Sequence, residues 1–358
     1  MTMELPAHSP GMTNMSDTHA GPIVRPETEI VPAAVEIGLS AAIITVRDDE
    51  PAVLTVRGAP DPRMPKDVRP PSPSLPFGPF SPRDHHTLDA GLRSWVREQT
   101  GLGLNYVEQL YTFADRGRHD ETGPNVVSIG YVALIRPGEA DDDTGTTSWR
   151  SWYDFFPWED WRSGKPQILS DTIEPRLLEW AARADVEKGS ARPANRMDRL
   201  HIAFGMDGGS WDEEKVLERF ELLYEAGLVE EAYRDDRDAA HEWNVRPTLG
   251  QALRFDHRRI LATSIGRVRA KIKYRPVVFE LMPDEFTLFE LQKTVEAILG
   301  PHLHKQNFRR LVESAGLVET TGEVRVKTGG RPARLYQFRK KVLLERPAPG
   351  VRVNLSRN

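Results

Sequence analysis

A short segment near the C-terminus combines the side chains that read DNA bases. Residues 305–310 are Lys-Gln-Asn-Phe-Arg-Arg, and a helix through them would present five polar side chains: Lys305, Gln306, Asn307, Arg309 and Arg310. Arginine can donate to both acceptors of guanine, and asparagine or glutamine can pair with adenine in the same bidentate way. We therefore expect this helix to enter the major groove of double-stranded DNA.

The elements around this helix match a winged helix-turn-helix. An earlier helix begins at Thr287, where Thr-x-x-Glu has the form of a capping box, and Gly300 ends it. After Gly316 two strands form a hairpin. Its tip carries basic side chains that suit phosphates or the minor groove, namely Lys327, Arg331 and Arg334. We assign residues 284–345 to a winged helix DNA-binding domain. The alternative is a solvated basic helix beside an ordinary hairpin.

The charge distribution agrees with a DNA-binding end. The chain has 358 residues and a formal net charge of −5. Residues 285–358 hold fourteen Lys and Arg against seven Asp and Glu, so this segment carries +7 and the remainder −12. A basic module on an acidic body indicates that the C-terminal part meets a polyanion while the rest has another task.

The residue types that are missing narrow the chemistry. The sequence contains no cysteine, which excludes disulfides, thiolate zinc sites, Fe–S clusters and a cysteine nucleophile. No apolar run approaches the roughly 20 residues of a membrane-spanning helix. The first residues lack the basic and apolar regions of a secretory signal. We expect a cytoplasmic protein of two or three domains that does not engage a membrane.

The N-terminal half is typical of a mixed sheet with one helix. Residues 1–35 are polar and rich in proline, which predicts a disordered tail. The elements expected after it are strands at 37–46 and 52–56 around a charged turn, a loop with nine prolines at 60–82, a helix from Thr87 to Gly101, and strands at 105–113 and 125–135.

Residues 75–102 resemble the Nudix signature, Gly-x5-Glu-x7-Arg-Glu-apolar-x-Glu-Glu-x-Gly-apolar. Leu75-Pro-Phe-Gly78 precedes the predicted helix, which ends in Val96-Arg-Glu-Gln-Thr-Gly-Leu102. In that family the carboxylates of the helix hold a divalent metal against a pyrophosphate, and Mg²⁺ requires such oxygen ligands. The resemblance implies an α+β chain with an N-terminal Nudix-like α/β/α sandwich.

The signature is degenerate in this chain. Counting back from the glycine that ends the helix, the Arg-Glu positions hold Ser94 and Trp95. The Glu-Glu pair is Glu98 and Gln99, and Asp84 stands at the first Glu position, although the segment is two residues too long for both counts. We expect the fold to persist without efficient hydrolysis, with no catalytic residues, no metal site and no required cofactor.

A wider resemblance extends beyond this box. Its segments are Val107–Phe113, Asp115–Arg118, Ser128–Leu134, Arg267–Lys271, Tyr274–Pro276, Phe279–Pro283, Phe286–Leu291, Asn307–Arg310 and Gly329–Pro332. Together they resemble the Nudix-related transcriptional regulators of NAD metabolism, the NrtR-like group, and most of all its NadQ-type branch. The resemblance implies a homodimeric repressor of NAD biosynthesis or salvage genes. It would bind a palindrome-like operator and sense an adenine nucleotide such as ADP-ribose, NAD or ATP.

Candidate contacts for this effector lie between the proline-rich loop and the strands that follow. They are Arg57, Arg116 and Arg118 for phosphate groups, Phe77, Trp95 and Tyr111 for the base, and Gly78, Glu98 and Gln99 from the degenerate box. The alternative for each aromatic residue is core packing, and for each arginine a surface charge.

The rest of the chain divides around an insertion. The sensor domain is expected at 36–165, a helical insertion at 166–249, and a return to the sensor domain at 250–283. A tail is expected at 346–358. Within these segments we predict helices at 175–184, 211–227 and 256–273 and a short strand at 277–281.

Two other functions fit parts of the sequence. An active Nudix pyrophosphohydrolase with an accessory nucleic-acid module would use Glu98 and Asp84 as metal ligands. The winged helix could instead bind a protein. Arg309→Ala and Arg310→Ala would then leave DNA affinity unchanged, because there would be none to lose. The histidine pairs at 85–86 and 302–304 and the acidic run 141–143 are more typical of exposed loops than of metal sites.

Overall fold

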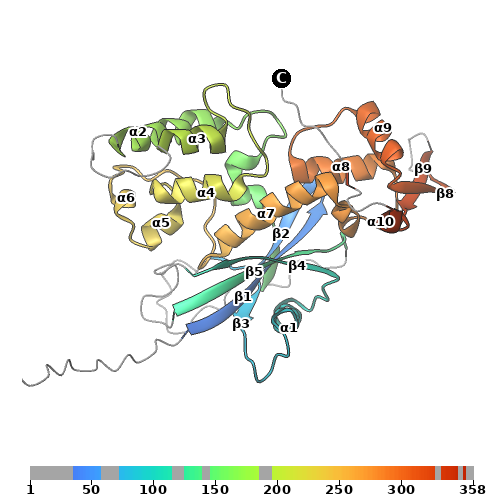
Figure 1. Cartoon of the computed structure of the whole chain (residues 1–358), viewed down its shortest axis with the longest axis horizontal. Helices are drawn as coiled ribbons and strands as arrows, with labels where there is room; N and C mark the ends of the chain where they lie inside the picture. Colours follow the sequence, from blue (N-terminus) through green and yellow to red (C-terminus); the bar gives the residue numbers. More distant parts are fainter. Residues whose placement is uncertain are drawn as a thin grey trace, which may run out of the picture. The chain divides into compact units, whose positions relative to one another are not determined.

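A mixed six-stranded sheet forms the centre of the N-terminal half (Figure 1). The computed structural model describes residues 35–57, 72–114, 125–138, 146–184, 196–326, 332–345 and 350–351. The strand order is β4-β5-β1-β2-β6, with β3 also paired to β1, and among the described strands only β1 and β5 run parallel. The strands are β1 (Val35–Arg47), β2 (Glu50–Val56), β3 (Phe77–Pro79), β4 (Tyr106–Phe113), β5 (Asn125–Leu134) and β6 (Thr147–Ser151).

The alternation of side chains along β1 builds two cores, one on each face of the sheet. Leu39, Ala41 and Ile43 pack in a cluster with α1 (Leu88–Thr100). Ala42 and Ile44 point to the other face and join the cluster that contains α7 (His257–Tyr274). Because successive residues of a strand face opposite sides, a strand that is apolar throughout needs a helix on both faces. The result is the α/β/α sandwich that the sequence predicts.

The tight turn between β1 and β2 has a simple local cause. Asp48 and Asp49 have φ angles of 51° and 60°, the left-handed conformation that a two-residue hairpin of type I′ requires. Aspartate tolerates this region better than most residues. The charged sequence at 47–50 was predicted to be a turn, and this prediction is confirmed.

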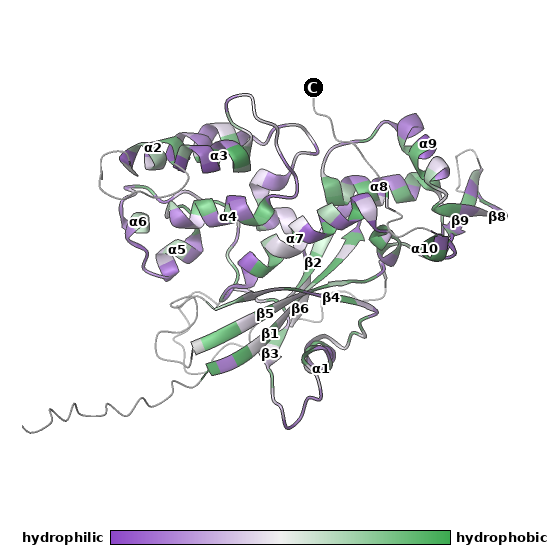
Figure 2. Cartoon of the chain, viewed as in Figure 1, coloured by the Kyte–Doolittle hydropathy of each residue, from purple (hydrophilic) through white to green (hydrophobic). Residues whose placement is uncertain are grey.

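Helices fill most of the segment between the sheet and α7. They include a π-helical turn, η3 (Leu169–Ile173), then α2 (Glu174–Ala184), α3 (Arg196–Phe204), α4 (Val216–Glu225), α5 (Glu230–Arg234) and α6 (Asp238–His241). Their apolar faces join the same core cluster as the α7 face of the sheet. Figure 2 shows the green and purple alternation of amphipathic helices on α2 and α3. The insertion therefore shares the core of the sheet.

The C-terminal part forms a compact winged helix. Its elements are β7 (Glu285–Phe286), α8 (Leu288–Leu299), α9 (Lys305–Ala315), β8 (Val318–Arg325), β9 (Ala333–Phe338) and α10 (Val342–Glu345). The three strands pair in the order β7-β9-β8. Eight of the twelve residues of α8 are buried, and this helix contacts both α7 and the strands β1 and β2.

Three predictions of secondary structure are wrong in part. Residues 277–281 form a 3₁₀ helix, η4 (Val277–Leu281), where we expected a strand, because a short apolar run does not distinguish the two. The helix expected at 211–227 begins only at Val216, after a turn. The loop at 60–82 contains β3, which pairs with β1 through Gly38↔Pro79 to Ser40↔Phe77. Pro79 fits there because it ends the strand.

The two tails have different outcomes. Residues 1–34 lie outside the described residues. Of the expected tail at 346–358, Gly350 and Val351 are described, and Val351 is buried with its N–H donated to the Ile272 carbonyl of α7 at 3.0 Å. Among the described helices, none combines the length and apolar character that a membrane span requires.

Candidate functional site

A buried carboxylate orders the turn that leads into α9. Glu296 of α8 accepts hydrogen bonds from the Leu303 N–H at 2.9 Å and from Gln292 at 2.7 Å. Its other oxygen faces His302 at 3.2 Å and Lys293 at 3.3 Å. Burial acts to raise the pKa of Glu296, but these donors outweigh it and hold the pKa below its ordinary value. The ionised carboxylate thus fixes where α9 begins.

The predicted base-reading face of α9 is exposed. Phe308 and Val312 are buried against the domain, and this orients the opposite side of the helix toward solvent. All five predicted residues lie on that exposed side: Lys305, Gln306, Asn307, Arg309 and Arg310. Arg309 pairs with Glu313 at 2.9 Å, one helical turn away. Within the described part of the chain, Asn307 and Arg310 have no polar partner, so their donors are available to a ligand.

The wing is basic where the structure describes it. Arg334 of β9 is exposed and stands opposite Val324 of β8. Arg325 of β8 pairs with Glu290 of α8 at 2.8 Å, which ties the hairpin to the capping box of that helix. The predicted wing residues Lys327 and Arg331 lie outside the described residues. Together α9 and Arg334 form a positive surface with few internal partners.

Trp95 and Gln99, which stand at carboxylate positions of the Nudix signature, fasten α1 to β3. Gln99 of α1 accepts the Phe77 N–H at 3.2 Å and donates to the Phe77 carbonyl at 2.5 Å. One turn earlier, the Trp95 indole N–H donates to the Pro79 carbonyl at 2.9 Å. A Cβ at Gly78 would lie 2.3 Å from the Trp95 ring. We call this group of Phe77, Gly78, Trp95 and Gln99 the β3 clasp.

The side chain of Gln99 makes hydrogen bonds that a carboxylate at this position could not make. A glutamine amide satisfies both polar groups of the Phe77 peptide, which a carboxylate cannot do because it only accepts. Glu98 is exposed on α1, and Asp84 accepts a hydrogen bond from Ser81 at 2.6 Å in a local turn. The described residues contain no group of three or more His, Asp or Glu that could hold a metal ion.

The remaining effector candidates do not join the clasp. Arg57 is exposed at the end of β2, and its N–H donates to the Thr146 carbonyl at 2.7 Å. Tyr111 is 61% exposed on β4 and contacts Phe113. Arg116 and Arg118 lie outside the described residues. The structure therefore brings four of the nine candidates together, with Glu98 on the same helix.

Two residues beside the clasp were missed by the sequence analysis. The Phe77 ring contacts Phe255 and His257 edge to face, with ring centroids 5.4 and 5.0 Å apart. His257 is buried, accepts the Leu75 N–H through Nδ1 at 3.0 Å and faces Ser40 through Nε2 at 3.2 Å. These contacts favour the neutral tautomer with the proton on Nε2. No local pattern marks His257, because its partners are distant in sequence.

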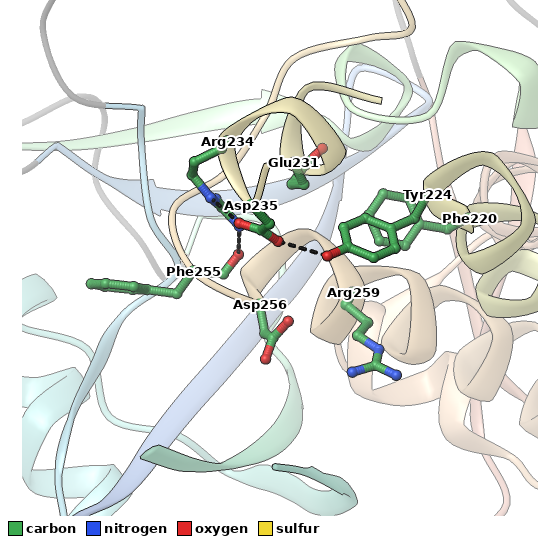
Figure 3. A pocket seen from close by; sticks show the side chains of 8 residues that line it. All are labelled: Phe220, Tyr224, Glu231, Arg234, Asp235, Phe255, Asp256 and Arg259. Atoms are coloured by element: carbon green, nitrogen blue, oxygen red, sulfur yellow. Dashed lines mark hydrogen bonds and ion pairs between the residues drawn. The ribbon is translucent and has the colours of Figure 1, made fainter. Parts of the chain in front are cut away.

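A small pocket lies between the insertion and the start of α7 (Figure 3). Its empty space is about 180 Å³, part of it open to solvent. Its polar groups bond to one another, as Tyr224 donates to Asp235 at 2.9 Å and Arg234 to the Phe255 carbonyl at 3.2 Å. Because that space includes open solvent, the enclosed part is too small for an adenine nucleotide.

Comparison with known proteins identifies the C-terminal domain. The family model of the NrtR DNA-binding winged helix domain matches residues 278–338. This segment is similar to an NrtR winged helix domain. The basic α9 and the hairpin described above lie within the matched residues, and the resemblance to the NrtR-like group noted in the sequence is confirmed.

Similar proteins extend this result to the rest of the fold. An ADPR responsive transcriptional repressor NtrR of Acinetobacter baylyi is 40% identical over 123 residues, which are 33% of this chain and 48% of that protein. The chain thus matches about half the length of this relative. A crystal structure of Shewanella oneidensis NrtR with a 27mer DNA aligns over 86% of this chain and 94% of its own, with 20% identity and a TM-score of 0.50.

The fold prediction is confirmed by these similarities. The chain combines a Nudix-like sandwich with the NrtR winged helix at its C-terminal side. At these identities the structural likeness concerns the fold alone.

Proposed function

We propose that this protein is a DNA-binding transcriptional repressor controlled by an adenine nucleotide. The observation that carries the proposal is the NrtR winged helix, whose α9 exposes Asn307 and Arg310 without polar partners in the described residues. Arginine and asparagine in this position suit bidentate contacts to guanine and adenine. Arg334, together with Lys327 and Arg331, would then meet phosphates.

ADP-ribose is the effector that we propose first. It is supported by the name of the Acinetobacter baylyi relative, which is ADPR responsive, and NAD and ATP share its adenosine diphosphate part. We propose that the ligand lies beside the β3 clasp, where Phe77 is half-buried and Glu98 exposed. Arg57, Tyr111, Arg116 and Arg118 would complete the site. The genes controlled would be those of NAD biosynthesis or salvage.

We also propose that the protein is a homodimer in the cytoplasm and not a hydrolase. Two copies of α9 would read a palindrome-like operator with half-sites about one DNA turn apart. The hydrolase alternative would have to rely on Glu98 and Asp84, because Trp95 and Gln99 stand where the Nudix signature has carboxylates. Incubation with Mg²⁺ and ADP-ribose, followed by product analysis, separates the two functions, because turnover at ordinary enzyme rates that disappears in Glu98→Gln would favour the enzyme.

A gel-shift experiment tests the central proposal. The probes are promoter fragments of NAD biosynthesis and salvage genes, each with and without ADP-ribose, NAD and ATP. We expect specific retardation of at least one fragment and a change of affinity with one nucleotide, since an effector that prefers one conformation shifts the equilibrium by its differential binding energy. The absence of specific retardation under every condition would refute the proposal.

A further inference from the structure

One buried carboxylate joins three parts of the chain. Glu159 of η2 (Pro157–Glu159) is 1% exposed and binds two guanidinium groups. Arg219 of α4 contacts both of its oxygens, at 2.6 and 3.0 Å, and Arg269 of α7 contacts one of them at 2.7 Å. All three side chains are within 1% of complete burial. We call them the Glu159 triad.

Arg219 anchors the helical insertion. Its Nη1 donates to the Ala203 carbonyl near the C-terminal end of α3 at 2.9 Å. It also donates to the Asp212 carbonyl, which precedes α4, at 2.8 Å. The guanidinium also stacks on Trp211, with its carbon 3.8 Å from the ring centroid. These contacts hold two separate parts of the insertion at Glu159.

Arg269 reaches the winged helix. Its Nε donates to the Ile298 carbonyl at the C-terminal end of α8, at 3.0 Å. Its Nη1 also donates to the Glu213 carbonyl at 3.0 Å. The neighbouring carbonyl in α8, that of Ala297, accepts the Tyr153 hydroxyl at 3.4 Å. The end of α8 is therefore attached to the Nudix-like body through named hydrogen bonds, and the turn that Glu296 fixes begins directly after it.

The charges of the Glu159 triad constrain the positions of its members more than they add to the stability of the fold. Two guanidinium groups share one carboxylate, so one positive charge is left to be solvated by backbone carbonyls. A buried ion cluster gains little net stability, because desolvation offsets the attraction, but each partner must keep its place or leave a buried charge exposed to an apolar environment. Few alternative arrangements satisfy every donor at once.

We propose that the Glu159 triad positions the winged helix relative to the Nudix-like body, with Arg269 as the positioning residue for DNA binding. This inference rests on the proposed function. A shift at the end of α8 would be carried to α9 through the Glu296 turn. A dimer must present two copies of α9 at the spacing of two half-sites, so an error in their placement weakens binding to the whole operator while a single half-site is bound as before.

The test compares two buried arginines of the same helix. Arg269→Lys keeps the charge but removes the fork that spans Glu159 and Ile298. Arg258→Lys is the matched control. Arg258 is also buried on α7, bonds to Glu231 and to the Phe155 and Leu249 carbonyls, and makes no hydrogen bond or ion pair with α8 among the described residues. The DNA is a duplex selected from a random pool by the full-length wild type, and the same duplex with one half scrambled.

We expect the ratio of operator affinity to half-site affinity to fall about tenfold in Arg269→Lys. This factor corresponds to the free energy of one charge-assisted hydrogen bond. The ratio should stay at the wild-type value in Arg258→Lys, even if thermal unfolding shows that both variants lose stability. An unchanged ratio in Arg269→Lys overturns the proposal, and so does an equal fall in both variants. Equal wild-type affinity for the two duplexes also overturns it, whereas failure to select any duplex refutes the proposed function instead.

A milder variant covers the case in which Arg269→Lys does not fold. Tyr153→Phe removes only the hydroxyl that donates to Ala297, and the ring keeps its packing. We expect the same ratio to fall by about threefold, since a neutral hydrogen bond is worth roughly half of a charge-assisted one. If Arg269→Lys does not fold and folded Tyr153→Phe keeps the wild-type ratio of operator affinity to half-site affinity, the proposal is overturned.

Discussion

Replacing Gln99 by glutamate tests the β3 clasp most directly. The substitution restores the carboxylate of the Nudix signature at this position. It keeps an acceptor for the Phe77 N–H but loses the donor to the Phe77 carbonyl, which in the wild type lies 2.5 Å from Nε2. The introduced carboxylate oxygen would face a carbonyl oxygen instead. We therefore expect Gln99→Glu to loosen β3 from α1 without creating a metal site.

The expected loss of stability at pH 7.5 is about 2–3 kcal/mol. About 1 kcal/mol comes from the lost hydrogen bond, and the rest from leaving the half-buried Phe77 carbonyl unsatisfied. Urea denaturation followed by tryptophan fluorescence measures this difference. Ser94→Glu is the matched control, because it adds the same carboxylate to an exposed position of the same helix, where we expect a change within about 0.5 kcal/mol.

The loss should depend on pH with a defined sign. Only the protonated form of the introduced carboxyl can donate to the Phe77 carbonyl, so folding raises its pKa above the ordinary value of about 4.3. The penalty is therefore absent below that value and grows as pH rises through the folded pKa. A Gln99→Glu variant as stable as the wild type at pH 7.5, or a loss of equal size in Ser94→Glu, would refute the clasp.

Further predictions concern the clasp, the turn and the recognition helix. Gly78→Ala should destabilise the protein by about 1–3 kcal/mol in the same urea assay, because the new methyl group would overlap the Trp95 ring. Glu296→Gln should lower the free energy of unfolding by about 2 kcal/mol at pH 7. The pKa of Glu296 is lowered on folding, so the wild type loses this advantage as pH falls below the ordinary value of 4.5, and thermal unfolding at pH 7 and pH 4 should show the two proteins converging. Arg310→Ala should weaken binding to the selected operator by about 1–3 kcal/mol in a gel shift, and equal binding by wild type and variant would argue against α9 as the reading helix.

The elements with strong local signals were predictable from the sequence. Thr287 and Glu290 form both hydrogen bonds of a capping box, and Gly101 and Gly316 end their helices in the left-handed conformation. These signals act within four residues of the chain, so a single sequence contains all the information that they need. The order of helices and hairpin in the winged helix followed from them.

Short elements with distant partners were not predictable. β3 and β7 have three and two residues, and each exists only through pairing with another strand. The proline count around β3 argued against any strand, and it could not show that β1 offers a free edge there. Residues 277–281 were assigned to a strand for the same reason, since their apolar pattern does not reveal what they pack against.

The effector site stays a prediction. The sequence analysis named Trp95 and Gln99 as substitutions in a metal site and as candidate contacts for the effector, and neither role indicated that they bind β3. The structure shows that both side chains bind the backbone of β3, about 20 residues earlier in the chain. Phe255 and His257, which contact the same loop, come from a segment more than 170 residues later, beyond the reach of any motif.

By itself, the sequence determined which side chains are available to this protein. It has no thiol, it has Trp95 and Gln99 on the helix that resembles the Nudix signature, and it has a basic helix and wing at the C-terminal side of an acidic body. Tertiary structure alone decided how the parts are held together. Glu159 meets Arg219 and Arg269 across 60 and 110 residues, and Arg269 meets α8 across a further 29. Such contacts arise because a buried charge must find every partner in three dimensions, and one-dimensional spacing does not encode them.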